Sequence, residues 1–173
     1  TVTQLKTIDN DGYDAIQVGY GERKQKHLSK PLKGHFDKVG VEPKRILAEF
    51  EKVPGFDYQL GQSFHVGIFN EGDYVSVSGL SKGKGFTGVI KRHNFARQKK
   101  THGTGHTERA PGSIGQASDP SRVFPGMRMA GQHGNAKVTI ENLEIMKIDK
   151  ENNQLLIKGS VPGAKNSTLF IRK

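Results

Sequence analysis

The stretch DYVSVSGLSKGKGFTGVIKRHNF, residues 73–95, contains the transition that decides how this chain folds. Its first seven residues alternate in strand fashion and place Val75 and Val77 on one face. From Ser81 onward glycine and positive charge replace the alternation, and residues 81–134 hold ten of the 22 glycines. This basic segment, residues 81–134, lacks a sustained amphipathic period, so it cannot bury enough apolar surface to offset its ordering entropy. A stretch of this kind inside a compact domain is normally functional or disordered.

Regular patterns lie on both sides of the basic segment. Strands are expected over several alternating or β-rich stretches: 13–18, 63–69, 73–79, 137–149, 154–161 and 167–173. A short helix is expected over 30–40, where Pro31 suits the first turn and Gly40 the end. Residues 45–51 are ambiguous in period, and residues 150–153 read as a turn.

Strands before and after the basic segment favour a mainly β fold. The simplest architecture is one antiparallel barrel or sandwich made of residues 1–80 and 135–173, with 81–134 as a long insertion. Two domains joined by a linker are the weaker alternative, because the last 39 residues are too few for a core of their own.

Composition excludes several classes of protein. The 173 residues contain no cysteine, which excludes disulfides and cysteine-based zinc sites. The N-terminus lacks the charged start and apolar block of a signal peptide, and no apolar run approaches the ~20 residues of a membrane helix. The net charge is +10, and the basic segment carries most of it, with ten Lys and Arg against two acids. Such a concentration of positive charge indicates a polyanionic partner.

Gly83, Gly85 and Gly88 have the G-x-G-x-x-G spacing of a dinucleotide-binding turn. That motif needs a helix after the turn and an acid ~20 residues further on. The residues that follow are heavily charged without a pattern, and the acid at the right distance, Glu108, does not end a strand. A nucleotide-binding enzyme therefore remains a minor alternative.

The histidines of the basic segment could suggest a metal site. His102 and His106 have the i, i+4 spacing of two ligands on one helix face, but Gly103 and Gly105 make a helix there unfavourable. No carboxylate pair lies in a plausible catalytic context. We therefore expect no catalytic residues, no metal and no cofactor.

Phosphate binding without chemistry is the interpretation that remains. Lys and Arg neutralise phosphates, glycines allow close backbone approach, and aromatic or imidazole rings stack on unpaired bases. Phe86, His93 and Phe95 are the rings suited to stacking, and Asn94, Gln98, Gln116 and Gln132 can contact base or ribose edges. Folded RNA fits better than duplex DNA, because a long irregular arm suits a crevice and no recognition helix is visible.

Family-like blocks run through the whole chain. They are DGYDAIQVGYG, KPLKGHF, VSGLSKGKGFTGV, APGSIG, PSRVF, MAGQ, VTIENLEI and LLIKGSVPG. In this order they resemble the bacterial family of large-subunit ribosomal protein three. The resemblance implies a translation-protein-type β-barrel with a long basic, Gly-rich internal loop that penetrates the large-subunit (23S-type) rRNA. It also implies a structural protein of the large subunit that supports early assembly and is not an enzyme.

The resemblance also assigns positions within the basic segment. Lys82, Lys84, Lys91, Arg92 and His93 match the family's basic stem, and Arg122, Arg128 and Gln132 match the returning limb. The expected rRNA-binding set also includes Asn94, Arg97, Lys99, Lys100, His102, His106, Arg109 and His133. Residues 112–121, the tip, match the part of the loop nearest the peptidyl-transferase centre. The tip residues expected there are Gly112, Ser113, Gly115, Gln116, Ser118, Pro120 and Ser121.

Some positions depart from the family pattern. Pro125 and Met127 stand where lysine is usual, and His133 where methionine is common. Ser118 occupies the position of a glutamine that some members carry methylated, so this modification is expected to be absent. The chain begins inside the family pattern, which predicts that one barrel strand is missing.

By resemblance, the partners are large-subunit rRNA and the large-subunit proteins fourteen and nineteen, with no membrane and no small-molecule substrate. The expected location is a cytoplasmic ribosome, with an organellar ribosome as the alternative. A non-ribosomal RNA chaperone with a basic disordered arm is the other function that the composition allows.

Overall fold

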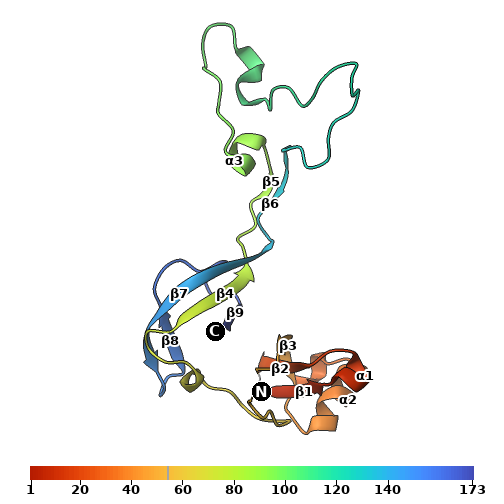
Figure 1. The fold of residues 1–173 in the computed structure, drawn as a ribbon, viewed down its shortest axis with the longest axis vertical. Coiled ribbons are helices and arrows are strands. Elements are labelled where there is room, and N and C mark those ends of the chain that lie inside the picture. The colour runs from red at the N-terminus through yellow and green to blue at the C-terminus, as the bar shows by residue number, and fades with distance from the viewer. Residues whose placement is uncertain (54) are drawn as a thin grey trace. The chain divides into compact units, whose positions relative to one another are not determined.

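The computed structural model describes residues 1–53 and 55–173. The chain is mainly β with few helices, as expected, and forms two compact units (Figure 1). Unit 1 comprises Thr1–Asn70 and Ile148–Gln154, and unit 2 comprises Glu71–Lys147 and Leu155–Lys173.

Unit 1 is built on a three-stranded antiparallel sheet in the order β1-β2-β3. The strands are β1 (Val2–Lys6), β2 (Ala15–Glu22) and β3 (Lys44–Glu51). The sequence predicted part of β2 and left β3 ambiguous, whereas β1 was missed. Apolar side chains of β1 and β2 are buried together with Phe36 of the helix α2, and these form the core of the unit.

Helix α2 (Lys30–Val39) confirms the helix expected over 30–40. Pro31 lies in its first turn, and Gly40 ends it with φ +69°, a left-handed conformation that glycine adopts without steric cost. The ring of His35 lies 2.9 Å from the side-chain carbonyl of Gln17 on β2, which ties the helix to the sheet. Shorter elements of unit 1 are α1 (Ile8–Asp11) and the 3₁₀ helices η1 (Gln25–His27) and η2 (Val66–Ile68).

The prediction of a strand over 63–69 was wrong, because this stretch contains η2. The backbone N–H groups of Ile68 and Phe69 donate locally to the carbonyls of His65 and Val66, at 3.3 and 3.1 Å. Local bonding of this kind leaves those groups unable to join a strand ladder.

Unit 2 contains a curled four-stranded sheet in the order β8-β7-β4-β9 (Figure 1). The strands are β4 (Tyr74–Leu80), β7 (Lys137–Asp149), β8 (Gln154–Ile157) and β9 (Leu169–Arg172). Val75 and Val77 are both buried, as their shared face predicted, and Ile145 of β7 is fully buried beside them in the sheet's core. The strands expected over 73–79, 137–149 and 167–173 are therefore confirmed. Strand β8 is shorter than predicted because Lys158 and Gly159 leave the strand conformation.

The basic segment connects β4 to β7 and contains four short elements. They are β5 (Gly85–Thr87), α3 (Val89–His93), η3 (Gly105–Arg109) and β6 (Gly131–His133). Strands β5 and β6 pair with each other in an antiparallel two-stranded sheet. Within the described parts of the chain, no helix has the length and apolar character needed to cross a membrane.

Candidate nucleic-acid interface

Residues 81–87 and 131–136 form a paired stem at the foot of the basic segment. Ser81 donates from its backbone N–H to Ala136 at 2.9 Å, and Lys84 donates to His133 at 2.8 Å. The ladder then continues through β5 and β6, where Phe86 lies opposite Gln132. The two limbs of the segment therefore leave the sheet and return to it side by side.

Gly134 is the residue that allows this close pairing. Its φ is +70°, and a Cβ at this position would overlap the carbonyl oxygen of Lys82. Any other residue would have to displace the backbone of the opposite limb. The glycine content of the basic segment thus has a specific geometric reason at this position.

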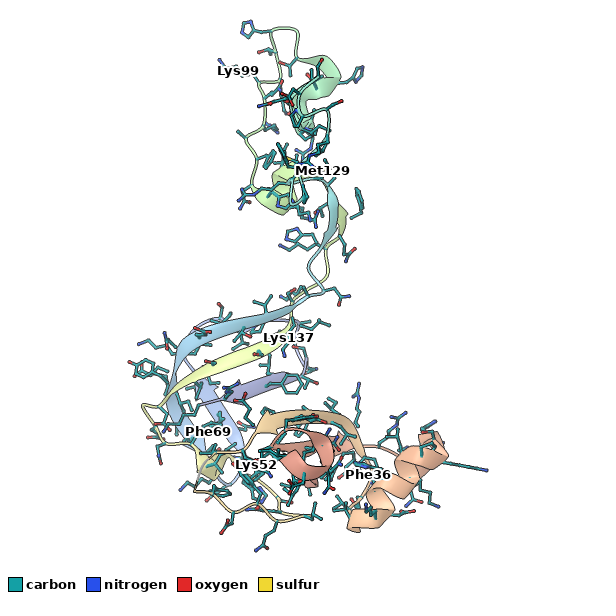
Figure 2. All side chains as sticks on the ribbon, turned by 45° about the vertical axis from the view of Figure 1, so that its right-hand side comes forward. Phe36, Lys52, Phe69, Lys99, Met129 and Lys137 are labelled. Carbon is teal, nitrogen blue, oxygen red and sulfur yellow. The ribbon has the colours of Figure 1, made fainter. Side chains whose placement is uncertain are left out.

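A second connection joins the limbs beyond the stem, where α3 meets the returning limb. Arg92 donates from Nη1 to the backbone carbonyl of Met129 at 2.7 Å, and His93 Nε2 lies 3.1 Å from the same oxygen. The Arg92 guanidinium also lies against Gly131, because a Cβ there would come within 2.7 Å of Nη1. Figure 2 shows Met129 beside α3. Arg92 and His93 therefore hold the two limbs together.

Further along, an ion pair joins the ends of the turn that contains η3. Arg97 Nε lies 3.1 Å from Glu108 Oε1, and the backbone N–H of Gln98 donates to the Glu108 carbonyl at 3.2 Å. Both side chains are partly exposed, so the ion pair contributes about 0–1 kcal/mol. Its consequence is electrostatic, since one of the two acids of the basic segment is neutralised within the segment.

Most of the predicted rRNA-binding side chains are exposed. The exposed members are Lys82, Lys84, Lys91, Asn94, Arg97, Lys99, Lys100, His102, His106, Arg109, Arg122, Arg128 and Gln132. Arg92, His93 and His133 are only half-exposed. Lys99 projects from the part of the segment beyond α3 (Figure 2). The structure brings Arg92, His93 and His133 together near the stem, with Lys84 and Lys91 close to His133, and distributes the cations beyond α3 along the segment.

His133 lies among cations at the stem. Burial of its ring, together with the positive charges of Lys84, Lys91 and Arg92, lowers the pKa of His133 below its ordinary value. Its Nδ1 is buried and has no hydrogen-bond partner in the described part of the protein. The lowered pKa favours the neutral form of the His133 imidazole, which can both donate and accept a hydrogen bond.

A hollow of about 550 Å³ lies at the foot of the stem. It is lined by Lys82, Lys84 and His133 from the stem, and by Val161 and Gly163 from the loop before β9, among others. Two lysines over an open surface of this kind suit a phosphate rather than an apolar ligand.

The tip, residues 112–121, is exposed except for the half-buried Pro120. Ser113 Oγ donates to the carbonyl of Gly115 at 3.0 Å, which makes a local turn. Gly112 has φ +82°, so this position needs glycine, whereas a Cβ on Gly115 would meet only the Arg122 carbonyl oxygen at 3.5 Å. Asp119 is the only charged residue of the tip. The tip presents small side chains rather than cations.

The glycine motif does not have the geometry of a dinucleotide turn. Gly85 lies in strand β5 and pairs with His133, so Gly83 and Gly85 are part of the stem, whereas Gly88 directly precedes α3. A helix does follow Gly88, contrary to expectation, but α3 has only five residues. The three glycines thus belong to the stem and to the start of α3, and they do not form a phosphate-binding turn before a long helix.

The histidines suggested by the sequence as possible metal ligands are His102 and His106. His106 lies in η3 and His102 precedes it, so a short helical turn forms despite the neighbouring glycines. Within residues 1–53 and 55–173, no three His, Asp or Glu side chains are grouped as a metal-ligand set.

Several residues that organise the segment were not assigned this role from the sequence, and Glu108 was considered only as the acid of a dinucleotide motif. Met129 and Glu108 act through a backbone carbonyl and an ion pair, and Gly131 and Gly134 through the absence of a Cβ. No local period marks them, because each depends on a partner in the opposite limb or across a turn.

Comparison with known proteins identifies the family of this chain. The family model described as Ribosomal protein L3 matches residues 57–155. The large ribosomal subunit protein uL3 of Laribacter hongkongensis is 52% identical over 172 residues, covering 98% of this chain and 80% of that protein. The uL3 protein of Chlorobium limicola is 53% identical over 171 residues (98% and 82%), and that of Neisseria meningitidis 50% over 175 residues (99% and 81%). The resemblance found in the sequence is therefore confirmed, and this chain belongs to the ribosomal protein L3 (uL3) family, whose members are structural proteins of the large ribosomal subunit and not enzymes.

Proposed function

We propose that this chain binds the large-subunit rRNA through the basic segment, supports early assembly of the subunit, and places the tip near the peptidyl-transferase centre. The observation that carries the proposal is the distribution of charge. Ten Lys and Arg and only two acids occur in residues 81–134, and nearly all of these cations are exposed. One of the two acids, Glu108, is already paired with Arg97.

The hydrogen bonds between the limbs support a role in penetrating RNA. A free 54-residue loop would lose much conformational entropy on entering a crevice. The stem, the Arg92–Met129 hydrogen bond and the Arg97–Glu108 ion pair remove part of that cost before binding. The cations then supply affinity through counterion release, and the small residues of the tip fill space by shape.

We also propose how the globular part of the chain is placed in the large subunit. Residues 1–80 and 135–173 form a translation-protein-type barrel in which 81–134 is inserted, and this globular part sits on the rRNA beside the large-subunit proteins fourteen and nineteen. The half-barrel curl of the sheet in unit 2 supports the barrel. The bacterial sources of the relatives support a cytoplasmic ribosome.

The test is co-sedimentation of the tagged chain with large subunits after a high-salt wash, followed by cross-linking of the chain to rRNA. Stable association with cross-links from the basic segment is the expected result. Binding to total RNA without retention on washed subunits would instead indicate a non-ribosomal RNA chaperone. Saturable binding of a nucleotide that competes with rRNA would favour the nucleotide-binding alternative.

A further inference from the structure

Phe86 is the most exposed large apolar side chain of the described residues, with 79% of its surface accessible. It lies in the middle of β5, on a two-stranded ribbon that has no other strand beside it among the described residues. An aromatic ring displayed on the surface of a β ribbon is the arrangement by which many RNA-binding sheets stack a base.

Gln132 lies directly opposite Phe86 in the antiparallel pair, and its side chain is also exposed. Directly opposed residues of two paired strands share a face, so the ring and the amide stand next to each other. The neighbours Thr87 and His133 belong to the other face, and Thr87 is buried. Phe86 and Gln132, the platform, thus present one flat ring with one amide that can donate and accept hydrogen bonds.

The surroundings of the platform leave room for a second flat ring. Gly88, two positions beyond Phe86, has open space around it, because an added Cβ there would meet nothing within 4 Å. Because 79% of the Phe86 surface is accessible and Gly88 carries no side chain, the ring is open to a planar group.

Charge decides which planar group fits. Lys82 and Lys84 are exposed just before Phe86 in the chain, and Lys91 is exposed just after it. The two acids of the basic segment, Glu108 and Asp119, lie elsewhere in it. A single ring among cations, beside an amide, suits a nucleotide, whereas an apolar protein helix would need several anchors in a row.

We propose that the platform is a binding site for one unpaired RNA base, which stacks on Phe86 while its edge contacts the Gln132 amide and its phosphate contacts Lys84. The proposal rests on the proposed function, because it specifies which nucleotides of the rRNA the stem contacts. These are nucleotides whose bases are not paired in an RNA duplex. A paired base has both faces covered by its neighbours and cannot stack here.

The absence of tryptophan from this chain permits a direct test. Phe86→Trp introduces a single indole at the platform, and the full-length chain is titrated with purified large-subunit rRNA and with single-stranded oligoadenylate. Base stacking is expected to quench the emission in both titrations, and a fully paired RNA duplex is expected to leave it unchanged. Tyr20→Trp is the matched control, because Tyr20 is similarly exposed, at 73%, but lies on β2 in the other unit.

A second variant measures affinity. Phe86→Ala is expected to weaken binding of oligoadenylate about 5- to 150-fold, the range for loss of one stacked base. Phe86→Leu, which keeps an apolar side chain but no ring, is expected to behave like Phe86→Ala. Circular dichroism of each variant checks the fold. Because position 86 is exposed, these substitutions should leave the fold unchanged.

The outcomes separate this proposal from the proposed function. If the chain binds rRNA but the indole at position 86 responds no more than that at position 20, the platform proposal is wrong and the proposed function stands. A response to a mixture of ribosomal proteins, without one to RNA, would assign the platform to a protein contact and also overturn the proposal. Failure of the wild-type chain to bind rRNA would overturn both.

Discussion

Arg92 and Met129, 37 positions apart in the sequence, are joined by a 2.7 Å hydrogen bond from the guanidinium to the backbone carbonyl. The bond connects the limb that leaves the sheet of unit 2 with the limb that returns to it. An arginine in an RNA-binding segment is usually assigned to phosphate, yet here at least one donor is used within the protein. A guanidinium has five N–H donors, so a phosphate contact by the remaining ones stays a prediction.

Arg92→Ala is expected to loosen the stem, because it removes the contact with Met129 and the guanidinium that lies against Gly131. The local opening free energy should fall by about 1 kcal/mol, since the bond is exposed but charge-assisted. Amide hydrogen exchange at Lys84, whose N–H donates to His133, reports this opening. Lys91→Ala removes an adjacent exposed charge and should leave the exchange unchanged. Equal exchange rates in the two variants would contradict the structural role of Arg92.

Gly134→Ala is expected to disrupt the stem more strongly. The new Cβ would overlap the Lys82 carbonyl oxygen, and the residue would be held at φ +70°. Strain of this kind costs about 1–3 kcal/mol or displaces the backbone. Gly88→Ala is the control, because a Cβ at Gly88 meets nothing within 4 Å. Thermal unfolding and exchange of both variants should show the loss only for Gly134→Ala.

An element of the fold could be predicted from the sequence only where a local sequence pattern determines it. The strands with alternating apolar residues, such as 73–79 and 137–149, were found because the period is visible in the sequence. Helix α2 was found because Pro31 and Gly40 mark its ends. Strand β1 was missed because its five residues show little alternation and are fixed by pairing with β2, whose register is irregular between Val2 and Gln4.

The organisation of the basic segment could not be predicted in the same way. Strands β5 and β6 have three residues each, too few for a period, and they exist because their limbs pair across more than 40 residues of chain. Charge and glycine content are visible in the sequence, and from them comes the prediction that the segment binds RNA. The hydrogen bond of Arg92 and the steric requirement at Gly134 depend on tertiary contacts with the opposite limb, so no local sequence pattern predicts them.

Unit 1 contains a network of charged side chains that should make the stability of the fold depend on pH. Tyr13 donates to Glu49 at 2.8 Å, Lys6 forms an ion pair with Glu49 at 3.1 Å, and these interactions lower the pKa of Glu49. A carboxyl whose pKa is lower in the folded than in the unfolded state stabilises the fold above the unfolded pKa. That contribution disappears as the pH falls through the folded pKa. Stability should therefore decrease below pH ~4.

Glu49→Gln is expected to reduce this acid dependence, because a neutral amide has no proton to gain. Melting temperatures measured between pH 3 and pH 7 would compare the variant with Glu22→Gln, which removes a carboxylate of the same sheet outside the network. A melting-temperature profile for Glu49→Gln as steep as that of the wild type would show that Glu49 does not couple folding to pH.

Lys82 and Lys84 are expected to contact phosphate, since both are exposed and line the hollow at the foot of the stem. Replacing both with alanine should flatten the log–log salt dependence of rRNA binding by about one to two units. Replacing both with arginine keeps the charge and should keep the slope. Filter binding at several salt concentrations measures this, and an unchanged slope for the alanine pair would place these lysines away from the RNA.

The tip should affect function without affecting affinity. The backbone of Gly115 is not in the left-handed region, so other residues can adopt its conformation. A Cβ added at Gly115 would lie 3.5 Å from the Arg122 carbonyl oxygen, which is an ordinary contact distance. Gly115→Ala should therefore be tolerated by the protein, whereas the larger Gly115→Val should push outward into whatever surrounds the tip. Neither change removes a cation, so the occupancy of the chain in large subunits should stay near that of the wild type.

Peptidyl transfer and the binding of drugs at the catalytic centre are the informative measurements for these two variants. If the tip sets the position of nucleotides near that centre, Gly115→Val subunits should be slower or bind such drugs differently, and Gly115→Ala should have a smaller effect. The paired Lys82 and Lys84 alanine variant should show the opposite pattern, with reduced occupancy and normal activity in the subunits that do assemble. Normal occupancy, normal transfer and normal drug binding in Gly115→Val subunits would mean that the tip only fills space, and that the limbs alone account for the function of the basic segment.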